Sequence, residues 1–414
     1  MNPLSSSQDP VTRRRDDSTE LDAMSYLVTR FATREIAPHV PEWDAAGEFP
    51  RTLYQRAAQL GLLGLGYPED LGGTPASHRM RNVATLALAR HGASGGVGAG
   101  LFSHSIGLPP VLRHGSPGLQ HEIIPPVLRG EKISALAITE PGGGSDVAAL
   151  RTTARLDGDE WVIQGDKIFI TSGMRADFFT VAVRTGDNPA ASDLADVSPG
   201  RARGNQGISL IVVPGDARGL TRTRLDKMGW HCSDTAQLHF DSVRVPARYL
   251  VGAVGQGFKI IMGNFNAERL GLSVAALGYA MACYDEAVEW ARRRRTFGQP
   301  LVERQVIRHK LVDMQMRIAS TQAWVDVVTD RADAGDELAG GDTTANWVAQ
   351  ICMLKNHATQ TLQFCADQAV QILGGMGYMR GTRSERIYRE VKVLMIGGGS
   401  EEIMKELAAR QLGL

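Results

Sequence analysis

The spacing of hydrophobic positions changes twice along the chain. Over residues 21–134, apolar side chains recur at three- and four-residue intervals between Pro- and Gly-rich breaks, which predicts a helical domain. Over 135–248, apolar and polar positions alternate in short runs divided by Gly-rich turns, as in strands buried on one face. We therefore predict a middle β domain with a barrel-like or sandwich-like form.

Long helical patterns return over 249–414. They cover 257–293, 303–334 and 343–373, and a shorter one follows Ser400. Their lengths are typical of a helix bundle. The chain is thus predicted to be an α+β multidomain protein with the domain order α, β, α.

Residues 1–20 differ from all three domains, because they are polar and mix both signs of charge. We predict a disordered lead-in there, since nothing in it can be buried. The acids among its arginines argue against a transit peptide, and it lacks the apolar core of a signal peptide. The sequence contains no apolar run of the length that a membrane span needs. A cytoplasmic location is expected.

The charge balance excludes some partners. Lysine plus arginine number 45 and aspartate plus glutamate also 45, so no net field attracts nucleic acid or an anionic membrane. The four cysteines form neither a C-x-x-C pair nor a metal-ligand spacing with histidine, so we expect reduced thiols and no metal site. Any anionic ligand must be bound by local groups.

Three known signatures are matched only in part or not at all. Residues 92–96 fit G-x-S-x-G, but a helical pattern precedes them where a hydrolase needs a strand. His121 and Glu122 open an H-E-x-x-H zinc pattern whose second histidine position holds Pro125. No glycine run has the spacing of a nicotinamide-binding turn. All three kinds of site are therefore disfavoured.

Two strand ends carry groups suited to a planar or anionic ligand. The run ITEPGGGSD (138–146) places three glycines beside hydroxyls, and glycine lets backbone N–H groups approach a ligand closely. The run KIFITSG (167–173) ends a second strand in an aromatic and a hydroxyl pair. Each is an ordinary turn when taken alone, but together they could wall a flat cofactor.

Three further motifs lie at helix ends. RRRRTFGQP (292–300) ends a helix with an arginine fork and an aromatic, which suits a pyrophosphate, although a solvated helix end is the alternative. QILGGMGY (371–378) ends another helix in glycines, and IGGGSEEI (396–403) starts the last helix with an N-cap serine. Taken alone, the last two are helix caps.

Glu268 interrupts an apolar helix face. In FNAERLGLS (265–273) it falls within a stripe formed by Ile261, Phe265, Leu272, Ala275 and Tyr279. Buried carboxylates are uncommon unless they are paired or functional. The residue therefore either forms a core ion pair, for example with an arginine of the bundle, or carries a function.

In this order the motifs resemble the acyl-CoA dehydrogenases, flavoproteins with an N-terminal helical domain, a middle β domain and a C-terminal four-helix bundle. The resemblance covers roughly residues 21–414 and is carried by five motifs in register: GLLGLGYPEDLGG, ITEPGGGSD, GDKIFITSG, RRRRTFGQPL, and QILGGMGY followed by IGGGSEEI. It implies an FAD cofactor, an acyl-CoA substrate, electron transfer to an electron-transferring flavoprotein, and a homotetramer.

By position, the resemblance implies contacts with the flavin ring from both strand ends: Leu136, Ile138, Thr139, Gly144 and Ser145 on one, Phe169 and Thr171 on the other. It implies pyrophosphate and adenosine contacts from Arg294, Phe297 and Gln305, and from Gln371, Gly374 and Gly375 of a neighbouring subunit. Ser400 and Glu402 match positions that close over the adenosine half. Ser145, Asn266 and Arg269 match substrate-binding positions.

The resemblance also gives Glu268 a role. Many family members carry the catalytic glutamate just before the last helix, where this chain has Gly398. The isovaleryl-CoA and long-chain branches carry it on the first long C-terminal helix in an E-R-L context, here Glu268-Arg269-Leu270. Glu268 would then remove the α proton, with its pKa raised on the apolar face, while a backbone N–H at Gly398 stabilises the enolate. The β hydrogen leaves as hydride to flavin N5, giving a trans-2-enoyl thioester.

Two alternatives share this fold. A flavin-dependent acyl-CoA oxidase or monooxygenase-like relative would pass electrons to oxygen, and a non-catalytic acyl-CoA-binding subunit would explain the missing glutamate at Gly398. No motif encodes the acyl chain, although the helix-borne base is associated with branched or long chains in the family. The glycines at 263, 271 and 278 would leave room for such a chain.

Overall fold

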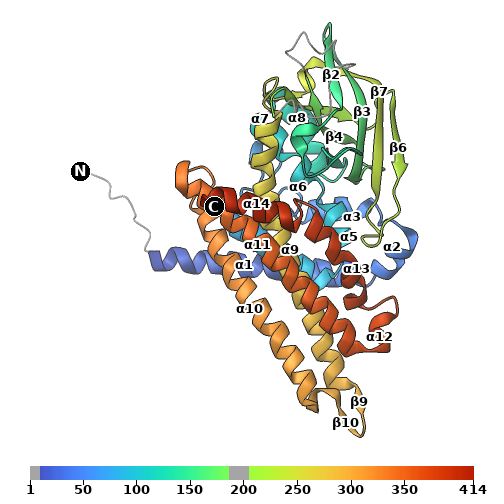
Figure 1. Ribbon diagram of the computed structural model, residues 1–414, viewed down its shortest axis with the longest axis vertical. Helices are drawn as coiled ribbons and strands as arrows, with labels where there is room; N and C mark the ends of the chain where they lie inside the picture. Colours follow the sequence, from blue (N-terminus) through green and yellow to red (C-terminus); the bar gives the residue numbers. More distant parts are fainter. Residues whose placement is uncertain (1–9, 186–204) are drawn as a thin grey trace, which may run out of the picture.

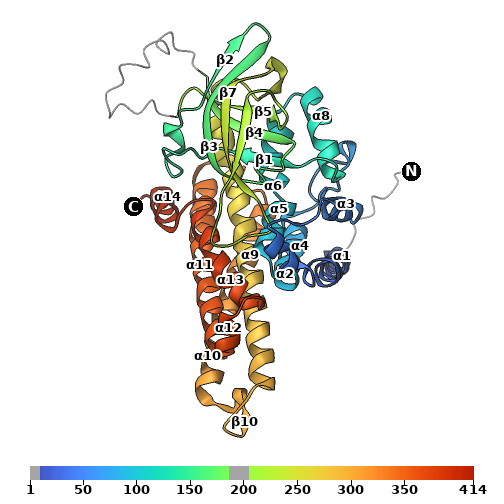
Figure 2. The same cartoon turned by 90° about the vertical axis from the view of Figure 1, so that its right-hand side faces the viewer.

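The computed structural model describes residues 10–185 and 205–414, with the backbone alone over 10–17. Three regions follow one another along the chain in the order α, β, α. Figure 1 shows the sheet at one end of an elongated molecule and the long helices of the bundle at the other. In the view of Figure 2, the N-terminal helices flank the molecule on the side away from α11 and α14.

Local signals start the N-terminal helices. Ser77, Ser94 and Ser116 each accept a hydrogen bond from the backbone N–H three residues on, which satisfies a donor that the helix itself cannot pair. The helices are α1 (Pro10–Phe31, continued by a π-helical turn over Ala32–Ile36), α2 (Val40–Ala46), α3 (Thr52–Gln59), α4 (His78–Gly92), α5 (Gly95–Leu101), α6 (His104–Gly107), α7 (Pro109–His114) and α8 (Pro117–Leu128).

Helix α1 corrects the expectation of a disordered lead-in over residues 1–20. It starts at Pro10, so residues 10–20 are helical, while residues 1–9 lie outside the described part of the chain. Proline is well tolerated at the first helical position, and the residues after it include no further proline and no glycine before Phe31. Mixed charge was a poor indicator of disorder here, because such a sequence can also form a helix.

The middle region is one mixed sheet of eight strands. They are β1 (Ser134–Ala137), β2 (Thr153–Asp157), β3 (Glu160–Thr171), β4 (Phe178–Arg184), β5 (Ile208–Pro214), β6 (Leu220–Arg224), β7 (Thr235–Pro246) and β8 (Leu250–Val251). Their order is β6-β7-β3-β2-β4-β5-β8, with β1 parallel to β4. The edge strand β6 was not predicted, because its LTRTR sequence is mostly polar and only partly buried.

The C-terminal region contains α9 (Gly257–Arg293), α10 (Gln305–Asp333), α11 (Gly341–Leu373), the short α12 (Gly375–Tyr378), α13 (Arg383–Ile396) and α14 (Glu401–Leu412). Helix α9 has the predicted bounds. A small hairpin of β9 (Arg295–Thr296) and β10 (Gln299–Pro300) joins α9 to α10. Ser400 caps α14, as its N-cap position predicted. Helix α13 was not predicted.

Two hydrophobic cores hold these regions together. The first combines buried side chains of the N-terminal helices with those of the sheet. The second belongs to the bundle but includes Ala89 and Ala93 near the end of α4. Here α4 approaches α9 so closely that a Cβ at Gly278 would lie 2.6 Å from the Ala89 Cβ. Gly278 therefore permits helix packing rather than making room for an acyl chain, whereas nothing lies within 4 Å of a Cβ at Gly263 or Gly271.

Candidate active site

Glu268 lies on α9 beside the glycine turn that joins α13 to α14. A Cβ built on Gly398 would lie 3.8 Å from Glu268 Oε1 and 2.8 Å from Leu272 Cδ1. The backbone there has φ values of +68° at Gly398 and +114° at Gly399, which side-chain-bearing residues rarely adopt. The two positions that the resemblance links to a catalytic glutamate, Glu268 and Gly398, thus adjoin one another in space.

The carboxylate of Glu268 has no fixed partner. Its side chain is partly buried, yet Oε2 is wholly buried and receives no hydrogen bond from any described residue. Burial raises the pKa of Glu268 to about 7, and the nearby charges of Arg269 and Lys355 offset part of that rise. No ion pair to Glu268 forms within the described chain, so the core-ion-pair alternative does not account for this residue.

Arg269 is bound to the glycine turn. It is buried, its Nε donates to Gly398 O at 3.0 Å, and its Nη1 donates to Asn266 Oδ1 at 3.0 Å. Its guanidinium also lies over the ring of Phe265, 5.7 Å from the centroid. Arg269 therefore braces the turn, and Asn266 holds Arg269 in place; their predicted role in substrate binding stays a prediction.

Lys355 is a buried cation that the sequence analysis missed. It lies on α11, and its Nζ donates to Met395 O at 3.0 Å and to Gly399 O at 2.5 Å. Burial lowers the pKa of Lys355 to about 8; Arg269 acts in the same direction, and Glu268 opposes both. The sequence did contain a signal for it: like Glu268, Lys355 is a charged residue among the apolar positions of a long helix.

The two strand-end loops lie next to each other. Ile168 N, from β3, donates to Thr139 O at 2.9 Å, so the run that follows β1 lies beside the end of β3. A register shift between β3 and β7 falls between Lys167 and Ile170. At that bulge Phe169 has a φ of +61°, and its ring is 66% exposed.

A buried ion pair between Glu140 and Lys167 connects the loop that follows β1 to strand β3. Glu140 Oε1 lies 2.8 Å from Lys167 Nζ, which also donates to Ile138 O at 2.9 Å. The Glu140 carboxylate further accepts from the N–H groups of Arg151 and Thr152 at 2.6 and 2.9 Å. Burial acts to raise the pKa of Glu140, but Lys167 and Thr152 outweigh that effect and lower the pKa. The pair connects the loop to β3 and was not identified from the sequence.

The groups assigned to the flavin ring are compatible with a flat ligand. Ile138 is buried, and Leu136, Thr139 and Thr171 are partly buried, whereas Phe169, Gly144 and Ser145 are exposed. An exposed aromatic held at a strained backbone position has no packing reason to be there. A planar ring resting between these loops would cover it, so the residues present fit a flavin.

Six of the other predicted cofactor positions lie at the far end of the bundle. Helix α9 rises about 37 Å from Glu268 to its last residue, at ~1.5 Å per residue. Arg294 follows directly, Phe297 is 97% exposed in the hairpin, and Gln305 begins α10. Figure 1 shows α12 and the hairpin at that same end, so the exposed Gln371, Gly374 and Gly375 also lie there. The structure brings these six residues to one end and separates them from Glu268.

Ser400 and Glu402 lie near Glu268, on the other side of the glycine turn. The Ser400 side chain accepts from Ile403 N at 3.4 Å as the cap of α14, and the Glu402 side chain is exposed in the first turn. Negative charge is favourable at a helix N-terminus, which gives both residues a structural reason for being there. Any cofactor contact from them would use groups that already stabilise the helix.

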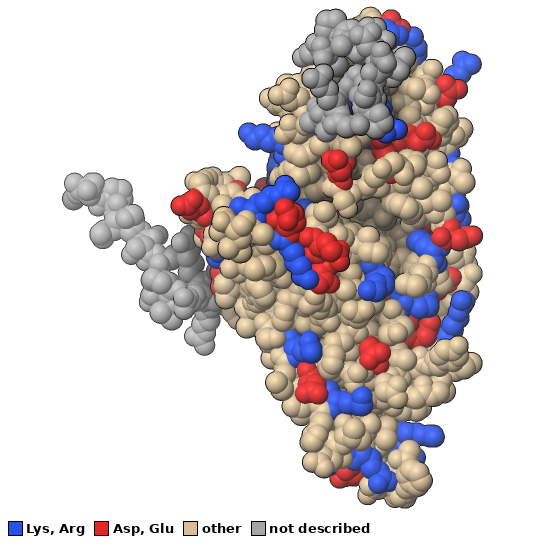
Figure 3. All heavy atoms as spheres, in the orientation of Figure 1, with Lys and Arg blue, Asp and Glu red and all other residues tan. Residues whose placement is uncertain are grey.

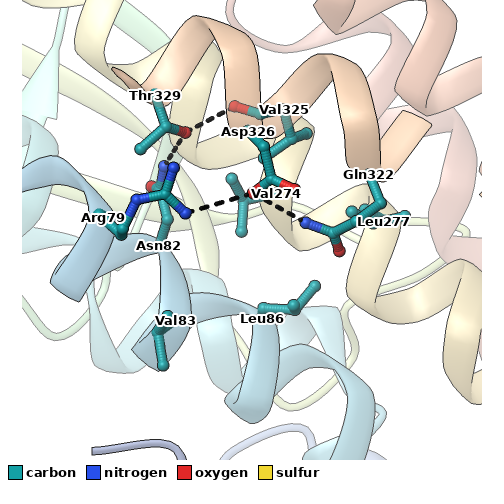
Figure 4. Close-up of a pocket in the computed structure, with 10 residues that line it drawn as sticks. All are labelled: Arg79, Asn82, Val83, Leu86, Val274, Leu277, Gln322, Val325, Asp326 and Thr329. Carbon is teal, nitrogen blue, oxygen red and sulfur yellow. Dashed lines mark hydrogen bonds and ion pairs between the residues drawn. The ribbon is translucent and has the colours of Figure 1, made fainter. Parts of the chain in front are cut away.

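A small cavity elsewhere in the molecule is distinct from this site. Figure 4 shows it between α4, α9 and α10, with Arg79 and Gln322 directed towards Asp326 and Asn82 directed towards Thr329. Its volume is about 40 Å³, whereas ligand pockets measure roughly 300–1,000 Å³. The cavity is therefore large enough for water but not for a thioester.

The visible surface carries no single-sign charge field. Figure 3 shows basic and acidic groups interspersed over the face seen in Figure 1. Among the described residues, no helix combines the length and apolarity that a membrane crossing needs.

Comparison with known proteins covers nearly the whole chain. Family models of the acyl-CoA dehydrogenase N-terminal, middle and C-terminal domains match residues 18–131, 135–243 and 255–413. The chain is 35% identical to the mitochondrial short-chain specific acyl-CoA dehydrogenase of Rattus norvegicus over 383 residues, 92% of this chain and 87% of that protein. It is 34% identical to the mitochondrial long-chain specific acyl-CoA dehydrogenase of Sus scrofa over 401 residues, 96% and 88% of the two chains.

A solved structure agrees with these matches. A Mycobacterium smegmatis protein described as an acyl-CoA dehydrogenase superposes with a TM-score of 0.87 at 46% identity, covering 95% of this chain and 97% of its own. The three regions and their order agree with that family, which is FAD-dependent. The chain therefore belongs to the acyl-CoA dehydrogenase family of FAD-dependent oxidoreductases.

Proposed function

We propose that this protein converts an acyl-CoA thioester to its trans-2-enoyl-CoA, with Glu268 as the base that takes the α proton. The observation that carries the proposal is the unpaired, buried Oε2 of Glu268 next to the glycine turn. A base works best when its pKa lies near the working pH, and burial raises the pKa of Glu268 to about 7. When bound, FAD supplies the acceptor for the β hydride.

The glycine turn is suited to stabilise the enolate that forms as the proton leaves. Among the described residues, none accepts a hydrogen bond from the backbone N–H of Gly398 or Gly399. Backbone donors that are already oriented towards developing charge lower the barrier without reorganising. The turn therefore supplies what the enolate oxygen needs within reach of the base, and its glycines leave space that a side chain would fill.

The cofactor positions support an oligomer. Leu136, Ile138, Thr139, Gly144, Ser145, Phe169 and Thr171 would hold the flavin ring near Glu268 of their own chain. The six distal residues, Arg294, Phe297, Gln305, Gln371, Gly374 and Gly375, are too far from that ring, so we propose that they serve the pyrophosphate and adenosine in a neighbouring subunit. A homotetramer satisfies this requirement. Arg294, Phe297 and Gln305, first assigned to the same chain, thus join the neighbour's group.

Acceptor and location are part of the proposal. An electron-transferring flavoprotein is the expected acceptor, and a cytoplasmic location agrees with four cysteines that are all free and buried. The helix-borne base favours a branched or long acyl chain, carried by CoA or by a carrier protein.

Anaerobic bleaching of the bound flavin tests the reaction class and the substrate together. The purified protein is mixed without oxygen with acyl-CoAs of increasing length and branching, and with an acyl-carrier-protein thioester. At least one thioester is expected to reduce the flavin and yield the 2-enoyl product. Absence of reduction by every thioester would contradict the proposal.

Two controls separate the alternatives that share the fold. Stoichiometric peroxide release in air, together with poor reduction of an artificial dye under nitrogen, would identify an oxidase. Purified protein without flavin absorbance that still binds acyl-CoA would identify a non-catalytic subunit.

A further inference from the structure

Lys355 is buried without a carboxylate partner. Its side chain is wholly inaccessible, and its neighbours on α11 include the buried Ile351, Leu354 and Ala358. No acidic side chain of the described chain lies within ion-pairing distance of Nζ; its two contacts are backbone carbonyls. A buried ammonium is costly, and a methionine would fill the same space without that cost. The position of the charge therefore needs an explanation.

Its two contacts span the glycine turn. Met395 O belongs to the last turn of α13, where carbonyls have no partner within the helix, and Gly399 O lies just before α14. Lys355 thus ties the last helical turn of α13 to the final residue of the glycine turn. Arg269 holds the carbonyl between them, that of Gly398, from α9.

The bonds to Gly398 O and Gly399 O fix the directions of two backbone N–H groups at the end of the turn. In a trans peptide the C=O of one residue and the N–H of the next point in opposite directions. Drawing the carbonyls of Gly398 and Gly399 towards the cations therefore turns the N–H groups of Gly399 and Ser400 away from them. Without such restraint a run of three glycines would sample many conformations. The cost of burying Lys355 is offset by a turn with one defined geometry.

We propose that Lys355 is a positioning residue for proton transfer, holding the Gly397–Gly399 turn in place against Glu268 through its bonds to Met395 O and Gly399 O. The inference rests on the proposed role of Glu268 and extends it to a residue on another helix. Lys355 itself touches no reacting atom; it acts through the turn and through its charge.

The charges around Glu268 support this coupling. Arg269 faces it from α9, and Lys355 faces it from α11, where Cys352 adds a thiol that interacts with both cations. The turn itself adds no charged side chain, and Glu401 on α14 acts on Lys355. Loss of Lys355 removes one of two cations that favour the ionised form of Glu268, so the carboxyl should then titrate at higher pH.

Infrared difference spectroscopy against pH measures this directly. The protonated-carboxyl band that is absent from Glu268→Gln reports the titration of Glu268, without any turnover. In Lys355→Met and Lys355→Gln, the midpoint of the Glu268 titration is expected about one pH unit higher than in the unchanged protein. In parallel, kcat should fall about tenfold or more with KM changed less than about twofold, because orientation rather than binding is lost. Lys355→Arg keeps the charge and should keep the titration near its original pH.

Lys227 provides a matched control. Its Nζ also donates to two backbone carbonyls, those of Trp230 and Ser233, and burial likewise lowers its pKa to about 8. Lys227→Met should cost stability without moving the Glu268 band. If Lys355→Met and Lys355→Gln lower stability but leave both the band and kcat unchanged, Lys355 is only structural and the inference is wrong. If the band moves while Glu268→Gln remains active, the coupling holds and the proposed role of Glu268 fails instead.

Discussion

Glu268 and Glu390 are two glutamates whose pKa values are raised alike but whose surroundings differ. Burial raises the pKa of each to about 7, and each has one buried carboxylate oxygen without a hydrogen-bond donor in the described chain. Glu390, on α13, nevertheless accepts from Gly95 N at 2.9 Å. No described residue donates to Glu268.

The neighbours of Glu390 are structural. Nearby, Arg386 forms an ion pair with Asp44 at 3.2 Å and donates to Ala93 O at 2.9 Å, so this cluster joins α13 to the N-terminal helices. A Cβ at Gly95 would lie 2.2 Å from Trp230 Nε1, which shows how tightly the cluster is packed. Glu268 instead adjoins an open turn of glycines and is partly exposed. A raised pKa alone does not identify a base; room for a substrate and available donors distinguish the two residues.

The largest expected difference between the two glutamates is the loss of kcat when each carboxylate is replaced by an amide. Glu268→Gln should lower kcat by roughly 10²–10⁴-fold, the usual contribution of a general base. Glu390→Gln should keep kcat within about threefold, because it leaves the base and the glycine turn intact. Dye-coupled turnover with the best thioester measures both variants. Comparable losses of kcat in the two variants would contradict the assignment of a catalytic role to Glu268 alone.

Glu140 is a buried glutamate whose carboxylate, unlike that of Glu268, is paired with a lysine, so it tests how such pairing affects stability. Lys167→Met leaves its carboxylate buried without a cation, which should cost about 3–5 kcal/mol of unfolding free energy. The double variant with Glu140→Gln should lose less than the sum of the two single variants. Urea denaturation provides the values. Additive losses would mean that the 2.8 Å contact between the two groups contributes no coupling.

Gly398 tests whether the turn beside Glu268 depends on glycine. Gly398→Ala places a side chain at a φ of +68° and 2.8 Å from Leu272 Cδ1, so it should cost about 1–3 kcal/mol of stability. Gly142→Ala is the control, because nothing lies within 4 Å of its Cβ and its φ is not positive. Equal melting temperatures for the two variants would show that the turn is not under this constraint.

Both glutamates should contribute to the pH dependence of stability, whereas only Glu268 should determine the pH dependence of activity. Each folded-state pKa is raised from 4.5 to about 7, so the native protein binds more protons than the unfolded chain within that window. Stability is thus highest at the acidic side and falls as pH rises from about 4.5 to 7, by about 1.4 kcal/mol per pH unit for each group.

Glu390→Gln and Glu268→Gln should each reduce that slope of unfolding free energy against pH. Only Glu268 should set the rise of kcat/KM with pH near 7, which Glu390→Gln should therefore retain. A slope unaffected by either substitution would show that neither carboxyl is protonated in the folded protein at pH 5–6.

The sequence predicted features that are local or periodic. The change of hydrophobic spacing gave the α, β, α order and the bounds of α9, and Glu268 stood out because it interrupts a stripe on one helix. Helix α1 was missed over residues 10–20 because charge was taken as disorder. The edge strand β6 was missed because its alternating arginines and threonines bury little.

The supporting groups of the site could not be predicted because their partners are distant in sequence. Lys355 contacts carbonyls 40 and 44 residues away, and Glu140 pairs with Lys167 across 27 residues. Backbone carbonyls carry no sequence signature, so nothing in the chain marks Gly399 as the partner of a lysine. The separation of Arg294 and its neighbours from Glu268 likewise follows from the length of α9, and the proposed second subunit rests on that separation.

Proton exchange at the α carbon tests most directly whether Glu268 is the base. A thioester with a quaternary β carbon, such as 3,3-dimethylbutyryl-CoA, has α protons but no β hydride, so deuterium uptake from D₂O reports deprotonation alone. The unchanged protein and Glu390→Gln should exchange these protons at similar rates, and Glu268→Gln should be slower by at least about 10²-fold. Exchange by Glu268→Gln at the unchanged rate would contradict the assignment.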